Sequence, residues 1–312
     1  MPYNNMISRS NAEALIPVET AQGIIKAATQ KSVVLSLMRK LPNMTAKQQK
    51  MHVLSALAVA GFVNGDTGLK PTSGESWKDK MITAEEIAVI IPIPEAVLDD
   101  ASYDIWGELK PQIEEEFGRI IDAAVLFGVD HPATWPEGIV TAAATAGKVV
   151  ALGTGTDIAE DVNQLMAAVE ACGYDVNGFI GDVTVKSKFR GLRDTNGGLL
   201  FQPSLTAGTP EILYGHPMRA LKNGAWDTTK GLMIGGDFQQ AVYAIRQDIT
   251  YKVLDQAVIS DGDGKIIYNL AQQDMVALRC VMRLGWQLPN PINRLEQDET
   301  KRYPFAVLTK GA

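Results

Sequence analysis

The sequence predicts a mixed α+β fold, in which helices and strands follow one another without a regular repeat. Residues 102–128 place apolar side chains at the spacing of an α-helix, whereas residues 276–288 alternate strictly, as a β-strand does. The chain has 312 residues, of which 46% are hydrophobic and 21% charged, and these are ordinary values for a folded globular protein. This length allows one large domain or two medium-sized domains.

The N-terminal segment carries a charge opposite to that of the remaining chain. Residues 1–50 hold seven basic and two acidic side chains, so the total of −7 leaves −12 on residues 51–312. A basic arm on an acidic body suggests that the arm lies on an acidic neighbour or faces a polyanion, and a solvated helix face is the alternative. Apolar residues at helical spacing between Ile24 and Leu41 predict a helix that ends at Pro42.

Two alternating segments enclose a stretch rich in Gly, Thr and Ser. Residues 51–59 and 87–93 each have the periodicity of a strand, and residues 61–76 lie between them. We therefore expect a long hairpin with a flexible tip. Two strands alone are marginally stable in water, so such a hairpin needs a surface to lie on, and a partner subunit is the natural candidate.

The segment 102–128 is expected to form the longest helix, with the apolar face listed at the end of this paragraph. Pro111 conflicts with an unbroken helix, and either kinks it or begins a second segment. Glu114, Glu115 and Glu116 are expected to lie largely toward water, and Gly128 ends the run. The predicted face consists of Ile105, Leu109, Ile113, Phe117, Ile120, Ala124 and Phe127.

Shorter elements follow. Residues 130–138 read as a loop, and 157–172 as a helix with Asp157 as its N-cap and Gly173 at its end. We expect a buried strand at 179–181, a helix at 183–193 and a turn at 196–198. Strands are expected at 233–237 and 241–246, and the strand at 276–288 should have one apolar face.

Few residues suggest chemistry. His52, His131 and His216 are far apart in sequence, and Cys172 and Cys280 are expected to be buried thiols. Residues 153–156 precede a helix as a phosphate loop would, but Ile158 replaces the third glycine of a dinucleotide fingerprint, so we expect a tight turn. Residues 261–265 superficially resemble a calcium loop, yet Ile266 and Gln272 stand where glycine and glutamate are required, so we expect a hairpin turn.

We therefore assign no catalytic, cofactor-binding or metal-binding residue, and we expect no cofactor. The polar start of the chain lacks the apolar core of a signal peptide, and no stretch approaches the ~20 apolar residues of a membrane span. We accordingly expect no membrane partner and assembly in a cytoplasm. Aromatic residues do not interleave with a basic cluster, so a sequence-specific nucleic-acid domain is not expected either.

Several phrases, taken in order, are similar to those of the major capsid proteins of tailed bacteriophages, which have the Hong Kong 97-type fold. The resemblance covers most of residues 30–310. No single one of these sequence segments is diagnostic, but the order of the segments along the chain is. The phrases are Ile87–Ala101, Ile105–Gly128, Trp135–Ile139, Asp194–Phe201, Leu213–Met218, Gly235–Tyr243 and Val276–Trp286.

The resemblance implies a structural subunit that assembles with itself into the pentamers and hexamers of an icosahedral head around double-stranded DNA. It implies a portal, decoration proteins and non-specific DNA contact as further partners. It divides the chain into an N-terminal arm (1–30), an extended loop (48–93), a peripheral domain with a long spine helix (31–47, 94–140 and 266–312) and an axial domain (141–265).

Two departures from the family pattern matter. Many relatives begin with a scaffolding segment that is cleaved, whereas this chain starts with the arm, so we expect a separate scaffolding protein or none. Some relatives join lysine to asparagine between subunits with the help of a glutamate. The candidates do not align with the reactive positions, and we expect ordinary exposed lysines and turn asparagines. They are Lys70, Lys78, Lys80, Asn290, Asn293 and Glu296.

Two other hypotheses remain open at this point. An encapsulin has the same fold and encloses an enzyme cargo, but the N-terminal arm shows no pattern of a cargo-docking helix. A cytosolic α+β enzyme is the third hypothesis, and a small oligomer with a deep pocket would support it.

Overall fold

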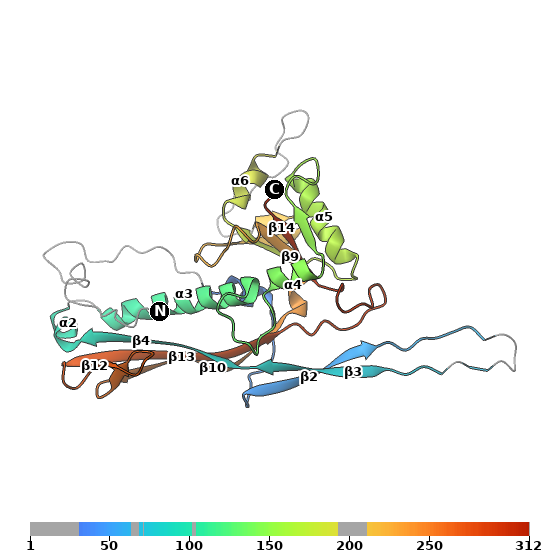
Figure 1. The fold of residues 1–312 in the computed structure, drawn as a ribbon. Coiled ribbons are helices and arrows are strands. Elements are labelled where there is room, and N and C mark those ends of the chain that lie inside the picture. Colours follow the sequence, from blue (N-terminus) through green and yellow to red (C-terminus); the bar gives the residue numbers. More distant parts are fainter. Residues whose placement is uncertain (1–30, 64–68, 71, 102–103, 193–210, 312) are drawn as a thin grey trace.

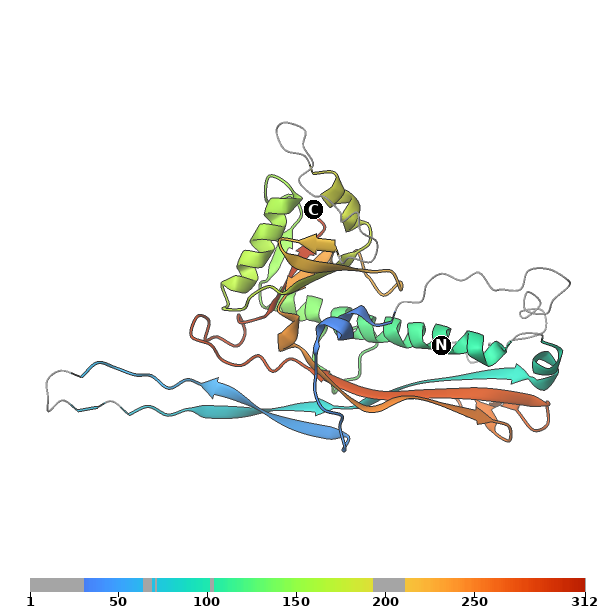
Figure 2. The ribbon, with the colours of Figure 1, turned by 180° about the vertical axis from the view of Figure 1, so that it is seen from behind.

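The computed structural model describes residues 31–63, 69–70, 72–101, 104–192 and 211–311. Over these residues the chain has a long base, an upper layer and a projecting hairpin (Figures 1 and 2). The base is a four-stranded sheet with a long helix lying along it. The upper layer contains a six-stranded sheet and stands over one end of that helix. The predicted turn at 196–198 and the N-terminal arm lie outside the described residues.

The four-stranded sheet is organised around one long strand, β13 (Met275–Gln287), which pairs antiparallel on both sides. Its partners are β10 (Val242–Leu254) and β4 (Glu85–Pro94). The two-residue strand β1 (Arg39–Lys40) adds to the other edge of β10. Because β4 is an edge strand, it tolerates Pro92 and Pro94, which lack the amide proton that a central strand must donate.

Helix α3 (Ile105–Phe127) covers one face of this sheet. Its buried residues form one core with alternate side chains of β13, among them Cys280, Leu284 and Trp286. Five of the seven residues of the predicted apolar face are buried, and Leu109 is half-buried and packs against the core. Ile120 is also half-buried, while the neighbouring Ile121 is buried. Pro111 lies inside the unbroken helix, and Gly128 ends it with a left-handed φ of 66° that favours glycine.

The upper layer is a mixed sheet in the order β5-β14-β9-β6-β8-β7. Helix α5 packs on it, and its N-cap Asp157 accepts a hydrogen bond from the Glu160 amide, as the sequence predicts. Its elements are β5 (Val149–Ala151), α5 (Ile158–Glu170), β6 (Gly178–Asp182), α6 (Val185–Arg190), β7 (Glu211–Leu213), β8 (His216–Leu221), β9 (Met233–Gly236) and β14 (Phe305–Thr309). Short helices lie around both layers: α1 (Val33–Leu37), α2 (Glu95–Asp100), α4 (Ile139–Thr145) and the 3₁₀ helix η2 (Phe238–Gln240).

The long hairpin exists, but the predicted pairing is wrong. Strand β2 (Gln48–Ala56) pairs with β3 (Ser76–Thr83), and the predicted second strand at 87–93 lies in β4 of the base instead. Periodicity predicts a strand but not its partner, and β13 offers a longer apolar ladder. The turn at 261–265 is confirmed, because it joins β11 (Val258–Ser260) to β12 (Ile266–Asn269).

The sheets also differ from the predicted domain boundaries. Strand β10 falls in the range 141–265 but belongs to the base sheet, and β14 falls in 266–312 but belongs to the upper sheet. The chain therefore crosses between the layers more often than contiguous ranges allow.

Strand β13 differs from the prediction of a single apolar face, since Ala277 and Val281 on its second face are also buried. The predicted helix up to Leu41 is short, because β1 replaces its last turn.

A buried carboxylate joins three distant segments. Asp122 on α3 is fully buried and accepts hydrogen bonds from Ser32 Oγ at 2.6 Å, the amides of Val33 and Val34, and Asn223 Nδ2 at 2.9 Å. Burial raises the pKa of this carboxyl above its ordinary value, although the four donors oppose that shift. Asp122 thereby fixes the start of α1 against α3.

Replacing Asp122 with alanine should lower the free energy of unfolding of the isolated subunit by about 2–4 kcal/mol, because it leaves several buried donors without an acceptor. Urea unfolding followed by circular dichroism measures the change. The control Asp263→Ala, in the exposed turn between β11 and β12, should stay within ~0.5 kcal/mol of the unsubstituted chain. Equal unfolding midpoints for both variants would contradict the role given to Asp122.

Candidate assembly surface at the base of the hairpin

The β2–β3 hairpin carries apolar side chains into solvent. Its strands pair from Gln48 opposite Thr83 to Ala56 opposite Ser76, and it projects away from both layers (Figure 1). Phe62 is fully exposed, Leu69 is 96% exposed and Trp77 is 62% exposed. Exposed apolar groups concentrated on one projecting element are typical of a surface that another protein covers.

The paired strands β2 and β3, which we call the base of the hairpin to distinguish them from its tip, are fastened by residues 288–304. These residues join β13 to β14, and we call them the strap. The Ile292 amide donates to the Leu54 carbonyl at 3.1 Å, and Arg294 Nη2 donates to the Ala58 carbonyl at 2.7 Å. These two bonds attach the strap to the backbone of β2 and of the segment just beyond it. They do not depend on the hairpin's side chains.

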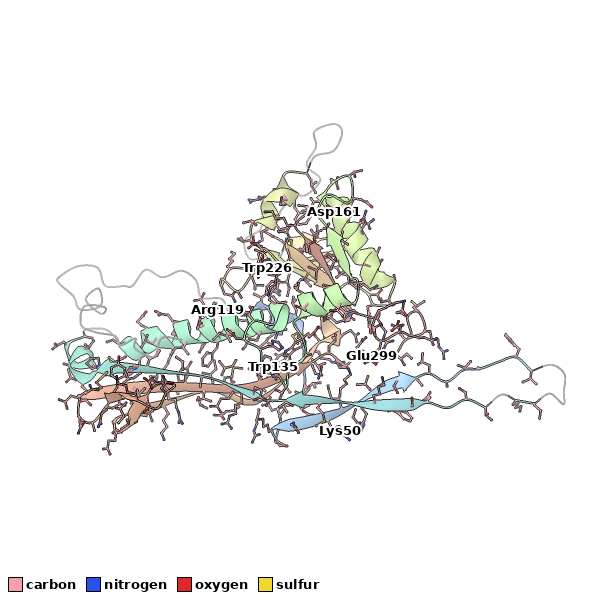
Figure 3. The ribbon with its side chains drawn as sticks, in the orientation of Figure 1. Lys50, Arg119, Trp135, Asp161, Trp226 and Glu299 are labelled. Atoms are coloured by element: carbon pink, nitrogen blue, oxygen red, sulfur yellow. The ribbon has the colours of Figure 1, made fainter. Side chains whose placement is uncertain are left out.

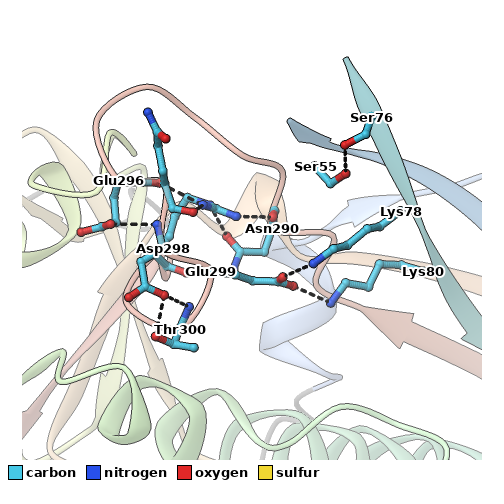
Figure 4. A network of polar contacts seen from close by, with 11 residues as sticks. Ser55, Ser76, Lys78, Lys80, Asn290, Glu296, Asp298, Glu299 and Thr300 are labelled. Carbon is cyan, nitrogen blue, oxygen red and sulfur yellow. Dashed lines mark hydrogen bonds and ion pairs between the residues drawn. The ribbon is translucent and has the colours of Figure 1, made fainter. Parts of the chain in front are cut away.

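A charge cluster fastens the other strand of the hairpin. The Glu299 carboxylate accepts from Lys78 Nζ at 2.8 Å and from Lys80 Nζ at 3.3 Å, one lysine for each oxygen (Figure 4). The Lys78 ammonium holds the pKa of Glu299 below its ordinary value. Exposed ion pairs of this kind each contribute little to global stability, but a shared carboxylate restricts the orientation of β3.

The strap is itself held by a buried arginine. Arg302 is 3% exposed, and its guanidinium donates to the carbonyls of Asn290, Glu296 and Gln297 and to Asn290 Oδ1. Asn290 has a left-handed φ of 50°, a conformation that asparagine tolerates better than most residues. The planar fork of Arg302 thus fixes the curvature of the strap through several carbonyls at once.

The same strap reaches the upper layer. Tyr174 Oη donates to Asn290 Oδ1 at 2.9 Å, and Asn293 Nδ2 donates to the Cys172 carbonyl at 2.6 Å. Burial raises the pKa of Tyr174, so its hydroxyl remains a donor at neutral pH. Figure 3 shows Glu299 between the hairpin that carries Lys50 and the upper layer that carries Asp161. The strap therefore couples the direction of the hairpin to the upper layer.

Most of the residues considered for a lysine–asparagine bond lie near the strap, and Lys70 lies farther out on the hairpin. Lys78, Lys80 and Asn290 line one cavity of about 140 Å³ together with Glu299 and Arg302. Within the chain the two lysines pair with Glu299, and Asn290 is held by Tyr174 and Arg302. Cross-linking between subunits is not tested by these contacts, and the expectation of ordinary lysines and asparagines stays a prediction.

The other candidate loops have structural roles. Residues 153–156 form the predicted tight turn, and the buried Asp161 carboxylate accepts from the amides of Gly153 and Gly155 at 2.8 and 2.7 Å. This side chain occupies the position where a phosphate would have to bind. Cys172 and Cys280 are buried free thiols, as predicted.

The three histidines do not converge. His52 pairs with Asp79 on the hairpin, His131 bonds the Gly128 carbonyl after α3, and His216 begins β8. In the part of the chain that the structure describes, no group of three or more His, Cys, Asp or Glu side chains could hold a metal ion. Among these described residues, no helix is both long and apolar enough to cross a membrane.

Sequence reasoning missed Glu299, Arg302 and Asp122. Glu299 and Asp122 act through partners that are far away in sequence, as in the pair formed by Glu299 and Lys78, whereas Arg302 bonds backbone carbonyls of the irregular segment just before it. The only local signal is at Arg302, a basic residue directly before the apolar run Tyr303–Leu308.

The family model for the phage capsid family matches residues 12–293. The chain belongs to the phage capsid family. The major capsid protein of Staphylococcus phage 80alpha is 26% identical over 286 residues, covering 90% of this chain and 84% of that protein. Two solved structures support the assignment. A chain of Microbacterium phage Oxtober96 is 38% identical with a TM-score of 0.83 over 98% of this chain and 100% of its own. A chain of Mycobacterium phage Cain is 32% identical with a TM-score of 0.82 over 98% and 99%.

This family membership confirms the predicted Hong Kong 97-type α+β fold and the structural role of a major capsid protein in the phage virion. The capsid of a native GTA particle shares the fold as well, at 19% identity and a TM-score of 0.69. Self-assembly into capsomers follows from the family. The exposed hairpin and its strap are therefore parts of a shell-forming subunit.

Glu299→Gln should loosen the base of the hairpin in this capsid protein without unfolding it. Amide hydrogen exchange in residues 76–83 should become a few-fold faster, while the free energy of unfolding changes by less than ~1 kcal/mol, because both ion pairs are partly exposed. Glu75→Gln, on an exposed residue beside β3, is the matched control. If both variants exchange at the unsubstituted rate, Glu299 does not hold the hairpin.

Acid should have the same effect on the unsubstituted chain. Because the pKa of Glu299 is lowered in the folded state, its contribution is fully present above the ordinary glutamate pKa of 4.5 and is lost as pH falls through the lowered value. Exchange in residues 76–83, corrected for its intrinsic pH dependence, should therefore rise as the pH falls below 4.5. In Glu299→Gln this acid-induced rise should be smaller, because only the pairs of Asp79 with Lys50 and His52 then remain to be lost in this segment, and an identical rise in the variant would assign it to another group.

Proposed function

We propose that this capsid protein assembles into the hexamers and pentamers of an icosahedral head, with the hairpin as the contact between neighbouring subunits. The observation that supports this role is the fully exposed Phe62, with Leu69 and Trp77, on a hairpin whose base is fastened. A two-stranded ribbon with apolar side chains is a liability on a monomer and is stabilised when a second copy covers it. Obligate interfaces of this kind commonly bury ~2,000–5,000 Å².

The two layers support an assignment of the predicted peripheral and axial domains, with domain boundaries that follow the sheets. The base, built from α3, β4, β10 and β13, corresponds to the peripheral domain. The upper layer, including β14, corresponds to the axial domain, which would line the five- and six-fold axes. Residues 1–30 would be the arm that clasps neighbours, and the hairpin within 48–93 would be the extended loop.

The remaining parts of the proposal concern the life cycle of the shell. The subunit acts mechanically: its domains tilt and the hairpin docks again as the shell expands, a change between two packings. This mechanical role requires no catalysis by the subunit. Assembly takes place in the cytoplasm of the bacterial host, with a separate scaffolding protein, a portal and decoration proteins as further partners. The finished shell touches packaged double-stranded DNA without reading its sequence.

Deleting residues 62–76 should leave a soluble, folded subunit that does not form shells, because the deletion removes the exposed apolar side chains Phe62 and Leu69 and spares both layers. Size exclusion followed by negative-stain microscopy, with scaffolding protein present, distinguishes shells and capsomer rings from free subunits. The control is the variant Val258→Ser, which carries its substitution at an exposed apolar residue of β11 and should still assemble. Shells of normal size from the deletion variant would exclude the hairpin as an essential contact.

A further inference from the structure

The cavity between the hairpin and the strap, which we call the strap cavity, has an excess of positive charge. Its described lining contains the three cations Lys78, Lys80 and Arg302 but a single carboxylate, that of Glu299. Three positive charges and one negative charge leave a net charge of +2 on this lining. The excess contrasts with the surrounding chain, because residues 51–312 together carry −12.

The buried cation of this lining has no anionic partner. Arg302 is 3% exposed, and its hydrogen bonds end on neutral oxygens, namely the carbonyls of Asn290, Glu296 and Gln297 and the side-chain amide oxygen of Asn290. Within the described part of the chain no carboxylate forms an ion pair with it, and Asp298 interacts with it only at longer range. A buried charge without a counter-charge costs stability, so the strap cavity favours an anion.

The two lysines have donors to spare. Lys78 and Lys80 are two positions apart on β3, which places them on the same face of the strand, and both point toward Glu299 (Figure 4). Each donates one hydrogen bond, to a different oxygen of Glu299. Because an ammonium group has three N–H donors, each lysine can bind a further acceptor while it keeps its bond to Glu299.

The space in the strap cavity fits a small oxyanion. Its volume of about 140 Å³ is several times the ~10–15 Å³ that one water molecule requires. The Ser55 hydroxyl and the Gln297 amide also line it and can act as neutral donors. An oxyanion with two negative charges would bring the net charge of the lining from +2 to zero.

We propose that the strap cavity binds one inorganic oxyanion with the charge and shape of phosphate, held by the ammonium groups of Lys78 and Lys80 and stabilised by the positive charge of Arg302. The lysines belong to the hairpin and Arg302 to the strap, so the bound ion joins the two elements in addition to Glu299. The direction of the hairpin then depends on the concentration of the oxyanion as well as on the chain's own contacts.

Titration calorimetry of the full-length, unassembled subunit tests the site, with inorganic phosphate as the probe at mildly alkaline pH and constant ionic strength. We expect saturable binding of one phosphate per subunit. The double variant Lys78→Gln/Lys80→Gln should bind at least about tenfold more weakly, because it removes the charge-assisted donors. The matched control Lys47→Gln/Lys50→Gln removes two exposed lysines that pair with other carboxylates, and its affinity should stay within about twofold.

Hydrogen exchange reports whether the bound ion fastens the hairpin. Saturating phosphate should slow amide exchange in residues 76–83 by about threefold relative to sodium chloride of equal ionic strength, and should leave β13 unchanged. The same slowing is expected in Lys47→Gln/Lys50→Gln but not in Lys78→Gln/Lys80→Gln. Slowing of β13 to the same degree would indicate a general effect of the salt and would contradict the site.

Three outcomes would overturn the proposal. The first is the absence of saturable phosphate binding, and the second is equal affinity in Lys78→Gln/Lys80→Gln and the unsubstituted chain. The third is binding of a short double-stranded DNA through these two lysines while inorganic phosphate does not bind, because that would assign the lysines to nucleic acid. None of these measurements involves shells, so failure here would leave the assembly role of the hairpin untouched.

Discussion

The pairing of β13 with β10 and β4 is the constraint on which the remaining structure depends. Ten residues of β13, from Met275 to Leu284, face β4 in continuous register, and β10 pairs along most of the other edge. Alternate side chains on this strand then form the surface on which α3 lies. Because one residue of slip would turn those side chains to the opposite face, the register of β13 also fixes the position of the long helix.

Polar groups then connect parts that the apolar core leaves independent. Asp122 holds the start of α1 to α3, Arg302 shapes the strap, and Glu299 joins the strap to the hairpin. Asp122 and Arg302 are buried and each is satisfied by several partners, and this is the condition under which a buried polar group stabilises one arrangement rather than destabilising all of them. These contacts set directions between elements, which a non-directional hydrophobic core does not do.

The same design leaves surfaces incomplete in a single copy. Phe62 and Leu69 extend into solvent, and β10 has an open edge. For a monomeric enzyme such features would favour aggregation, whereas a shell subunit requires surfaces that become buried when copies meet. Membership in the phage capsid family and these unsatisfied surfaces therefore point to the same conclusion, from comparison in one case and from physics in the other.

The sequence by itself determined the elements whose signals are local. The helix around Phe117, the strand around Cys280, the cap at Asp157 and the absence of a metal-ligand spacing follow from periodicity and short-range chemistry. Tertiary structure alone decided that β2 pairs with β3 and that Glu299 meets Lys78 across 221 positions. It also decided that β10 belongs to the base sheet and β14 to the upper sheet. Periodicity reports which face of an element is apolar, but partner choice depends on competing long-range packings, and these exist only once the whole chain has folded.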